Sequence, residues 1–269
     1  MALLELREST FGRLAELMRE SVGMDLGNAR RPAVAARLAP RLQRLGLDSH
    51  EAYVELIAGA DGAAELQMAV DLLTLPESHF FREPAHFDLL ESELSRLRPQ
   101  RLRLWSAATA SGEEAYSLAM LLADLQQTGR IGADWRILGT DISERALRAG
   151  AEALYPEDRL RHVTPERVRR YGLRGSAGAA GLVQMQAALR ERVEFSRWDL
   201  RQSADGLGPF DAILLRHALP YFDARTAQAL VERLLSRLRP GGLFFTGASE
   251  AFGHASLEPL APGAFRKTA

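Results

Sequence analysis

The sequence of 269 residues contains no cysteine. It therefore forms no disulfide, offers no thiolate to a metal ion and has no cysteine nucleophile. Six histidines are present, and none form a pair with ligand spacing on one helix face, so we expect no metal site. Lysine is nearly absent as well, because Lys267 is the only one and arginine supplies the remaining basic residues. We attribute this bias to genome composition and draw no function from it.

Long apolar runs and a large charge imbalance are also absent. No run approaches the roughly 20 residues of a membrane-spanning helix, and the acidic residues near the start do not resemble a signal peptide. We therefore expect a cytoplasmic protein without membrane insertion. The net charge of −1 gives no reason to expect nucleic acid as a partner. The length suffices for one large or two smaller domains, and we expect a monomer.

Residues 1–75 have helical periodicity and no strand pattern, which predicts a small all-α domain. Two sets of apolar residues fall on helix faces: Phe11, Leu14, Leu17 and Met18, and then Ala35, Leu38, Leu42 and Leu45. Asp48 and Ser49 are a plausible cap for a third helix, and residues 64–73 predict a fourth. Pro40 should kink or end the second helix.

That second helix is rich in arginine. The basic residues in and next to it are Arg30, Arg31, Arg37, Arg41 and Arg44. A row of this kind is most often a solvated face. The alternative is a patch that docks an acidic partner, and the pattern alone leaves both interpretations open.

The stretch LRLWSAATASGEEAYSL at 102–118 organises the remainder of the chain. An apolar segment ends in small residues, two glutamates follow, and a helical apolar period begins at Tyr116. This pattern is typical of the first strand, tight loop and helix of a nucleotide-binding sheet. The loop lacks the G-x-G-x-x-G pattern, and Glu113 and Glu114 place negative charge where a phosphate would otherwise bind. A cationic ligand suits this turn better.

Strand and helix patterns alternate after this turn, which predicts a doubly wound, mainly parallel sheet over residues 76–269. The expected strands are 135–140, 193–196, 210–215, 243–247 and 264–266, and the expected helices include 86–97, 155–170 and 223–239. Pro240 to Gly242 predicts a turn. The small-residue loop 172–181 and the strand-like 182–185 suggest an inserted antiparallel subdomain at about 171–192.

Two polar positions are candidates for ligand contacts. Asp141 follows the second strand, where an acid binds ribose hydroxyls in sheets of this kind. It is equally suited to cap the helix that starts near Ser143. A second candidate ligand segment is LPESHFFREPAHF at 75–87, in which Arg82 follows two aromatic residues that would by default be core.

Five segments, in this order, resemble the chemotaxis receptor methyltransferase (CheR) family. They are SHFFREPAHF, LWSAATASGEEAYSLAM, ILGTDIS, FDAILLRHALPYFD and LRPGGLFFTGASE. The resemblance implies a class I, Rossmann-like, S-adenosylmethionine-dependent methyltransferase domain behind a helical domain. It implies transfer of a methyl group to receptor glutamates as γ-methyl esters, with S-adenosylhomocysteine as product. It also implies a small antiparallel subdomain that in some members grips a C-terminal receptor tether peptide.

The resemblance further implies roles for single residues. Asp141 matches the ribose-binding acid, Ala108 and Glu114 match positions at the methionine end, and Asp199 lies where the adenine is contacted. The implied cofactor set is Ser78, Arg82, Ala108, Glu114, Asp141, Asp199, Leu200, Arg216 and His217. The implied catalytic residues are Arg82, Arg216 and Tyr221. The receptor-binding residues would be Arg37, Arg41 and Arg44.

The sequence departs from the family pattern at several positions. His217 stands where asparagine is usual, Pro220 directly precedes Tyr221, Pro76 stands where a polar residue can occur, and Gln43 replaces an expected arginine. These changes keep an alternative open, in which the protein is a cofactor-binding regulatory module with weak or no transferase activity. A methyltransferase with another substrate is a third hypothesis.

Overall fold

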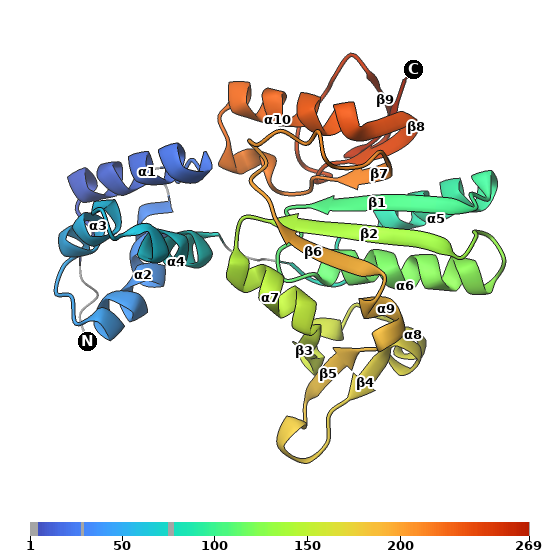
Figure 1. Cartoon of the computed structure of the whole chain (residues 1–269), viewed down its shortest axis with the longest axis horizontal. Coiled ribbons are helices and arrows are strands. Elements are labelled where there is room, and N and C mark those ends of the chain that lie inside the picture. Colours follow the sequence, from blue (N-terminus) through green and yellow to red (C-terminus); the bar gives the residue numbers. More distant parts are fainter. Residues whose placement is uncertain (1–4, 28–29, 75–77, 269) are drawn as a thin grey trace. The chain divides into compact units, whose positions relative to one another are not determined.

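The computed structural model describes residues 5–27, 30–74 and 78–268 (Figure 1). The chain divides into two compact units, the first formed by residues 1–75 with 220–227 and the second by 76–219 with 228–269. We describe each unit by itself. Pro76, one of the departures from the family pattern, lies outside the described residues.

The first unit contains the helices expected from the sequence. They are α1 (Glu8–Val22), α2 (Arg31–Leu45), α3 (His50–Ala58) and α4 (Ala63–Leu73). Phe11, Leu14 and Met18 of α1 are buried, as the periodicity predicts. The predicted cap of α3 is confirmed, because Ser49 Oγ accepts a hydrogen bond from Ala52 N at 3.2 Å.

Helix α2 differs from its prediction in two respects. It continues through Pro40, and both Pro40 and Ala36, whose carbonyl loses its hydrogen-bond donor, are exposed. The helix is held instead by the buried side chains of Val34, Leu38 and Leu42. Leu45, expected on the core face, is 36% exposed. Apolar burial on one face therefore outweighs the local effect of proline.

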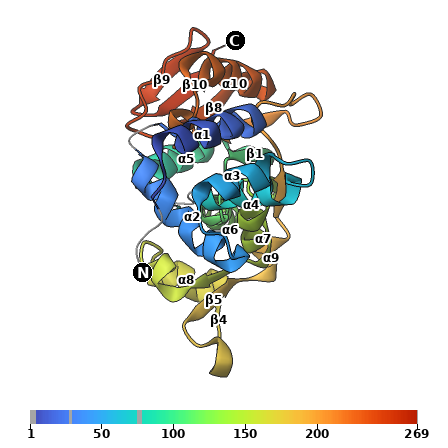
Figure 2. The same ribbon diagram turned by 90° about the vertical axis from the view of Figure 1, so that its left-hand side faces the viewer.

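The second unit is built on a sheet in which seven described strands have the order β6-β2-β1-β7-β8-β10-β9. The strands are β1 (Arg101–Ala107), β2 (Asp134–Asp141), β6 (Val193–Arg197), β7 (Phe210–Leu214), β8 (Leu238–Phe245), β9 (Leu257–Ala261) and β10 (Ala264–Lys267). The pairs from β6 to β8 are parallel, whereas β10 is antiparallel to both of its neighbours. Figure 2 shows β8, β10 and β9 together at one edge.

Alternation along the central strands builds a core on each face of the sheet. In β1, Leu104 packs into the core that contains α5 (Pro84–Leu97) and α6 (Glu113–Gln127), whereas Trp105 packs into the core that contains α10 (Ala224–Arg237). The expected doubly wound, mainly parallel architecture is therefore confirmed. Helix α7 (Glu144–Glu152) contacts β2 and β6.

Two details of the sheet differ from the sequence prediction. The expected turn at Pro240 to Gly242 lies within β8, where the pairing with β7 jumps from Phe210↔Leu238 to Ala212↔Leu243. A proline followed by two glycines is tolerated there because the ladder is interrupted at that point. Strand β9 was not predicted, because its residues carry no clear alternation of apolar and polar positions.

The inserted subdomain is a three-stranded antiparallel sheet with the order β3-β5-β4. Its strands are β3 (Leu154–Pro156), β4 (Gly172–Arg174) and β5 (Leu182–Met185), with α8 (Pro165–Tyr171) and three short helices at 157–160, 177–179 and 187–190 around them. The expectation of a helix throughout 155–170 is wrong at Tyr155, which lies in β3. Its ring packs edge-on against Phe80, a long-range contact that no local pattern reveals.

Candidate functional site

The loop after β1 is held in an unusual conformation at the carboxyl edge of the sheet. Ala108 and Ala110 have φ angles of 63° and 53°, in the left-handed region that alanine rarely adopts. Thr109 N donates to Thr140 O at 2.8 Å, which fixes the loop to the end of β2. Strained non-glycine residues persist only where the surroundings enforce them, and they are frequent at ligand sites.

Asp141 helps to hold this loop in its conformation. Its Oδ2 accepts a hydrogen bond from Ala110 N at 2.9 Å, and its Oδ1 accepts one from Ser143 N at 2.9 Å. The alternative role as helix cap falls to Ser143, whose Oγ accepts from Ala146 N at 3.1 Å. Asp141 thus shapes the small-residue loop at the end of β2, and its expected role in binding ribose stays a prediction.

Gly112 gives the loop room to enter α6. Its φ of 91° disfavours any side chain, and a Cβ there would lie 2.9 Å from Phe195 Cζ and 3.0 Å from the Tyr155 hydroxyl. That hydroxyl donates to Ser111 O at 2.7 Å. The inserted subdomain is therefore bonded to the same loop.

Arg216 is a buried cation between two carboxylates. Its side chain is 2% exposed, and its guanidinium contacts Glu114 Oε2 at 2.9 Å and Glu83 Oε2 at 2.8 Å. It also donates to the carbonyl of Arg82. A residue enclosed in this way has little access to a substrate, so the geometry favours a positioning role for Arg216 over the expected catalytic one.

Glu83 is the centre of a second set of contacts at this edge. Its Oε1 lies 3.1 Å from His217 Nε2 and accepts from Ala248 N at 3.2 Å. Burial raises the pKa of Glu83. The hydrogen bond from Arg216 and the nearby positive charges together outweigh this effect, so the net shift of the pKa is downward. Burial, with the charges of Arg82 and Arg216, lowers the pKa of His217 against the opposing effect of Glu83.

Glu250, after β8, ties the ends of two strands together. Its Oε2 accepts hydrogen bonds from the main-chain amides of His217 and Gly247. Its Oε1 is buried and has no hydrogen-bond partner among the described residues. Burial raises the pKa of this carboxyl group. His217 itself has a φ of 59°, so the clamp holds a strained backbone.

The two adjacent glutamates at the start of α6 have different surroundings. Glu114 accepts a hydrogen bond from Ser106 Oγ at 2.6 Å and pairs with Arg216, so both of its carboxylate oxygens contact other protein groups. Glu113 is 1% exposed, and burial raises its pKa. Its Oε1 lies 3.4 Å from Arg159 Nη1. Each of the two glutamates therefore lies beside an arginine, so the negative charge expected at this turn is balanced within the protein.

Ser78 and the residues after β6 complete the expected cofactor set. Ser78 is half-buried, and its carbonyl accepts from Arg159 Nη1 at 3.0 Å. Asp199 forms a local ion pair with Arg201, with a shortest contact of 2.8 Å. Leu200 is half-buried and its carbonyl accepts from Arg233 at 2.7 Å. Both carboxylate oxygens of Asp199 accept from the guanidinium of Arg201, and Oδ1 also accepts from its main-chain amide at 2.8 Å, so its expected contact with the adenine stays a prediction.

Tyr221 belongs to the helical unit rather than to the unit that holds Arg82 and Arg216. The guanidinium of Arg30 lies over its ring, 4.7 Å from the centroid, and Asp25 N donates to its carbonyl at 2.7 Å. Its expected catalytic role therefore stays a prediction.

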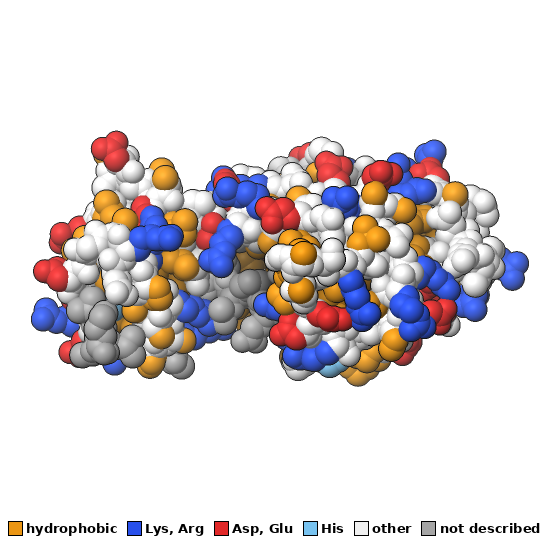
Figure 3. Space-filling view, turned by 90° about the horizontal axis from the view of Figure 1, so that it is seen from below, with side chains coloured by type: hydrophobic (Ala, Val, Ile, Leu, Met, Phe, Trp, Pro, Cys, Tyr) orange, Lys and Arg blue, Asp and Glu red, His pale blue; other side chains and the backbone are white. Residues whose placement is uncertain are grey.

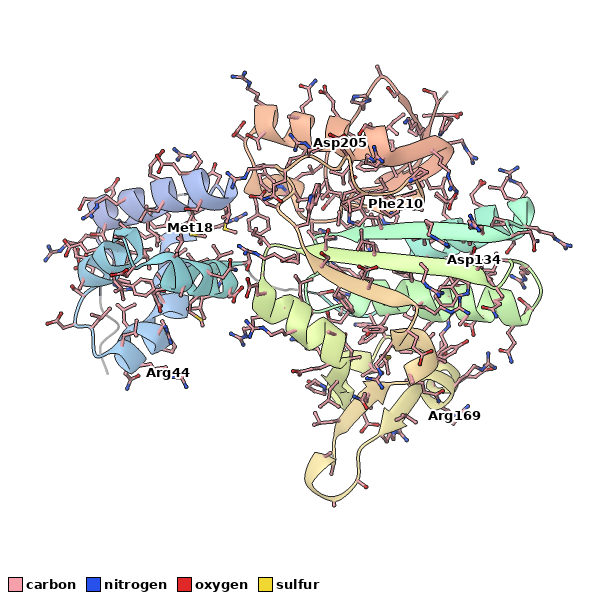
Figure 4. The ribbon with its side chains drawn as sticks, viewed as in Figure 1. Met18, Arg44, Asp134, Arg169, Asp205 and Phe210 are labelled. Carbon is pink, nitrogen blue, oxygen red and sulfur yellow. The ribbon has the colours of Figure 1, made fainter. Side chains whose placement is uncertain are left out.

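The three arginines expected to bind the receptor are not equivalent. Arg41 forms a bidentate pair with Glu65, with contacts of 2.8 Å and 2.5 Å, and Arg37 donates to Leu73 O at 3.2 Å. Arg44 is exposed, and Figure 4 shows it at the outer end of α2. Of the three, Arg44 alone has no ion pair or hydrogen bond with another described residue. Part of the arginine row therefore stabilises the helical unit.

Three residues of this region were not singled out from the sequence: Glu83, Arg159 and Glu250. Glu250 follows a predicted strand, so the rule that selected Asp141 could have found it. Arg159 lies in the inserted subdomain and carries no local signal. Its place beside Glu113 results from the packing of distant segments.

The residues present fit S-adenosylmethionine. The small-residue loop and Gly112 allow close approach to the backbone, and the Asp141 carboxylate suits ribose hydroxyls. Arg82 is half-buried and lines a cavity with Ser78 and Arg159. Within residues 5–27, 30–74 and 78–268, no group of three His, Asp or Glu side chains is placed to hold a metal ion. No helix in these ranges is long and apolar enough to cross a membrane.

Two parts of the chain match models of known protein families. Residues 9–74 match the family described as CheR methyltransferase, all-alpha domain, and residues 76–261 match CheR methyltransferase, SAM binding domain.

Similar proteins match over nearly the whole chain. The chemotaxis protein methyltransferase of Escherichia coli K12 is 36% identical over 93% of this chain and 87% of its own length. Chemotaxis protein methyltransferase 2 of Pseudomonas aeruginosa PAO1 is 36% identical over 91% of this chain and 88% of its own. The solved structure of S-adenosylmethionine-bound CalS10, an amino pentose methyltransferase of Micromonospora echinaspora, has a TM-score of 0.36 at 15% identity over 60% of this chain and 49% of its own. A likeness that weak adds nothing to the assignment.

Proposed function

The chain belongs to the CheR methyltransferase family, and on this premise we propose that it methylates glutamate side chains on the cytoplasmic helices of chemoreceptors. Its cofactor is S-adenosylmethionine, which the matching domain binds. The observation that carries the proposal is that both CheR domains match in this chain and that chemotaxis protein methyltransferases are about 36% identical to it over nine-tenths of its length.

The chemistry demands little of the protein beyond positioning. When bound, the cofactor supplies a methyl group already activated by a positively charged sulfur. A glutamate side chain is ionised near neutral pH, so no general base is needed to activate it. The protein must hold the acceptor carboxylate in line and limit the access of water. Arg82 is the cation that we propose orients this carboxylate, through charge-assisted hydrogen bonds.

In this proposal Arg216 holds Arg82 in position and does not contact the acceptor carboxylate itself. Its hydrogen bond to the Arg82 carbonyl and its pair with Glu83 fix the backbone from which the Arg82 side chain projects. Its pair with Glu114 joins that backbone to the start of α6, beside the proposed cofactor loop. Arg216 therefore serves as a positioning residue in this proposal, and Tyr221 remains a candidate for the transfer site.

The inserted subdomain supports a narrower proposal about receptor docking. Strand β4 lies at an edge of the small sheet, and its Leu173 is 51% exposed. We propose that a receptor tether peptide pairs along the subdomain. Deletion of residues 174–181 should weaken binding to a tethered receptor and leave cofactor affinity unchanged; equal loss of both would contradict this docking mode.

A labelling assay tests the main proposal. Purified protein, S-adenosylmethionine with a labelled methyl group and receptor cytoplasmic fragments should yield base-labile label on the fragments. Arg82→Ala and Asp141→Ala should reduce it by orders of magnitude, and Arg169→Ala, on the exposed surface of α8, should not. Calorimetry on the same samples measures cofactor binding. Binding without turnover on any receptor fragment would favour the regulatory module instead.

A further inference from the structure

Tyr155 is a buried tyrosine of the inserted subdomain that the proposed chemistry does not use. It lies in β3, where it pairs with Val183 of β5, and it is 4% exposed. The face of the molecule seen in Figure 3 carries basic and acidic side chains interspersed, as expected of a solvated surface. Tyr155, in contrast, lies beneath the surface. Burial, and then the charge of Glu113, raises the pKa of its hydroxyl well above the ordinary value, so this group is a hydrogen-bond donor near neutral pH.

The Tyr155 hydroxyl donates to Ser111 O at 2.7 Å. Ser111 lies in the loop between β1 and α6, and the residues on either side of it have left-handed φ angles, 53° at Ala110 and 91° at Gly112. A backbone of this kind persists only where its surroundings hold it. The bond from Tyr155 is therefore one of the contacts that keep the loop in its conformation.

The Tyr155 ring contacts the other candidate ligand segment. It packs edge-on against Phe80, with ring centroids 5.0 Å apart and an interplanar angle of 83°. Phe80 is fully buried and lies two residues before Arg82. The next residue, Phe81, is tied to α6 because its amide donates to Ser117 Oγ at 2.9 Å. One side chain of the inserted subdomain thus contacts both the loop after β1 and the segment that carries Arg82.

A second attachment of the same subdomain lies at the other end of α6. Asp124, in the last turn of that helix, accepts hydrogen bonds from the Tyr171 hydroxyl at 2.6 Å and from Arg167 Nε at 2.8 Å. Asp124 lies about 16 Å along the helix axis from the first residue of α6. Tyr155 and Tyr171 therefore both join the subdomain to the core by a hydroxyl group, but only Tyr155 does so at the loop.

We propose that Tyr155 is a positioning residue for S-adenosylmethionine, which holds the loop after β1 in the conformation that binds the cofactor. The inserted subdomain then contributes to the cofactor site in addition to its proposed docking of a receptor tether. A loop that is already held in its bound conformation costs less to order when the ligand binds. The inference rests on the placement of the cofactor at this loop, which belongs to the proposed function.

Two matched variants test the role of the hydroxyl. Tyr155→Phe removes the bond to the loop and keeps the ring, whereas Tyr171→Phe removes the bond at the far end of α6. In calorimetry, Tyr155→Phe should raise the Kd for S-adenosylhomocysteine about fivefold, the effect of losing one hydrogen bond. Tyr171→Phe should leave this Kd unchanged, although urea denaturation should show similar losses of stability for both. In the labelling assay, Tyr155→Phe should raise the KM for S-adenosylmethionine and leave kcat unchanged, because its hydroxyl contacts the loop and not the acceptor.

Hydrogen exchange on the wild-type protein tests the same coupling without a variant. Because coupling between two sites is reciprocal, S-adenosylhomocysteine should protect the amides of β3 more than those of α8, the helix that ends at Tyr171. This measurement decides the matter if Tyr155→Phe fails to fold, and unchanged protection of β3 would overturn the inference.

Two other results would overturn the inference and leave the proposed function standing. The first is a Kd of Tyr155→Phe equal to that of wild type. The second is an equal rise of the Kd in Tyr155→Phe and Tyr171→Phe, since general attachment of the subdomain would then explain the effect. Absence of any cofactor binding by the wild-type protein would overturn both the inference and the proposed function.

Discussion

Two arginines form ion pairs in different regions of this protein, and the settings differ. Arg216, at the carboxyl edge of the sheet, is 2% exposed and joins Glu83 to Glu114. Arg41, in the helical unit, is 20% exposed and pairs with Glu65, which also accepts from the Tyr53 hydroxyl at 2.9 Å. An arginine expected to act in catalysis is thus enclosed, and one expected to bind a receptor is engaged within its own unit. The presence of an arginine in a motif or a row does not show that its charge is available.

The largest difference between the two regions should appear when the arginine is removed. Arg216→Ala leaves two half-buried carboxylates without their shared cation, and we expect a loss of about 3 kcal/mol in the free energy of unfolding. Urea denaturation measures it. Arg216→Lys keeps the charge but cannot bridge both partners in the same way, so its loss should be smaller. Equal stability of wild type and Arg216→Ala would show that the buried bridge is not a structural element.

A pair of glycines tests the same contrast without removing a charge. Gly112 and Gly46 both have left-handed φ angles, of 91° and 67°, but a Cβ meets neighbours at 2.9 Å only at Gly112. Gly46→Ala should cost about 1 kcal/mol from backbone strain. Gly112→Ala should cost about 2–3 kcal/mol, since the loop must also shift, and it should weaken cofactor binding in calorimetry. Equal losses would mean that the site loop is no more tightly packed than a surface helix end.

The arginines of α2 provide a smaller and more local test. Arg41→Ala should lower the free energy of unfolding by about 1–2 kcal/mol, because it removes a half-buried bidentate pair. Arg44→Ala should change stability by less than about 0.5 kcal/mol, and its effect should appear in receptor binding. Thermal denaturation and a receptor pull-down separate the two effects. A receptor-binding defect confined to Arg41→Ala would contradict our assignment of Arg41 to stability and of Arg44 to receptor binding.

The pH dependence of stability should show the smallest difference. The hydrogen bond from Arg41 lowers the pKa of Glu65, against the opposing effect of burial. A lowered folded pKa contributes stability above the unfolded value, about 4.3, and that contribution is lost as pH falls through the folded pKa. Wild type should therefore lose more stability than Arg41→Ala between pH 6 and pH 3 in denaturant titrations. Parallel losses would indicate that the Glu65 pKa is not set by Arg41.

Much of the fold could be predicted because its signals are local. Short apolar strands, small-residue loops and amphipathic helices alternate along the chain, and their order alone implies a mainly parallel sheet. Strand β3 and the interrupted β8 could not be predicted in the same way. Tyr155 is placed in β3 by packing against Phe80, and the Pro240 segment has the composition of a turn. In both cases tertiary contacts override the local preference.

The sequence predicts which residues belong to the candidate site better than it predicts the role of each residue. Asp141 follows from its place after a strand, and Arg216 from the family resemblance. The partners of Arg216 lie 102 and 133 residues away in the sequence, so neither its burial nor its bridging contacts have a local signal. The same holds for Arg159, whose contact with Ser78 spans 81 residues. Roles that depend on long-range packing require the structure.

The position of the transferred methyl group tests the central claim most directly. After incubation with S-adenosylmethionine, receptor cytoplasmic fragments should be digested and their peptides analysed by mass spectrometry. We predict methyl groups on glutamate side chains, removed by mild base, and none with Arg82→Ala. Base-stable methyl groups on other residues, or cofactor binding without any methylated peptide, would contradict the assignment as a receptor glutamate methyltransferase.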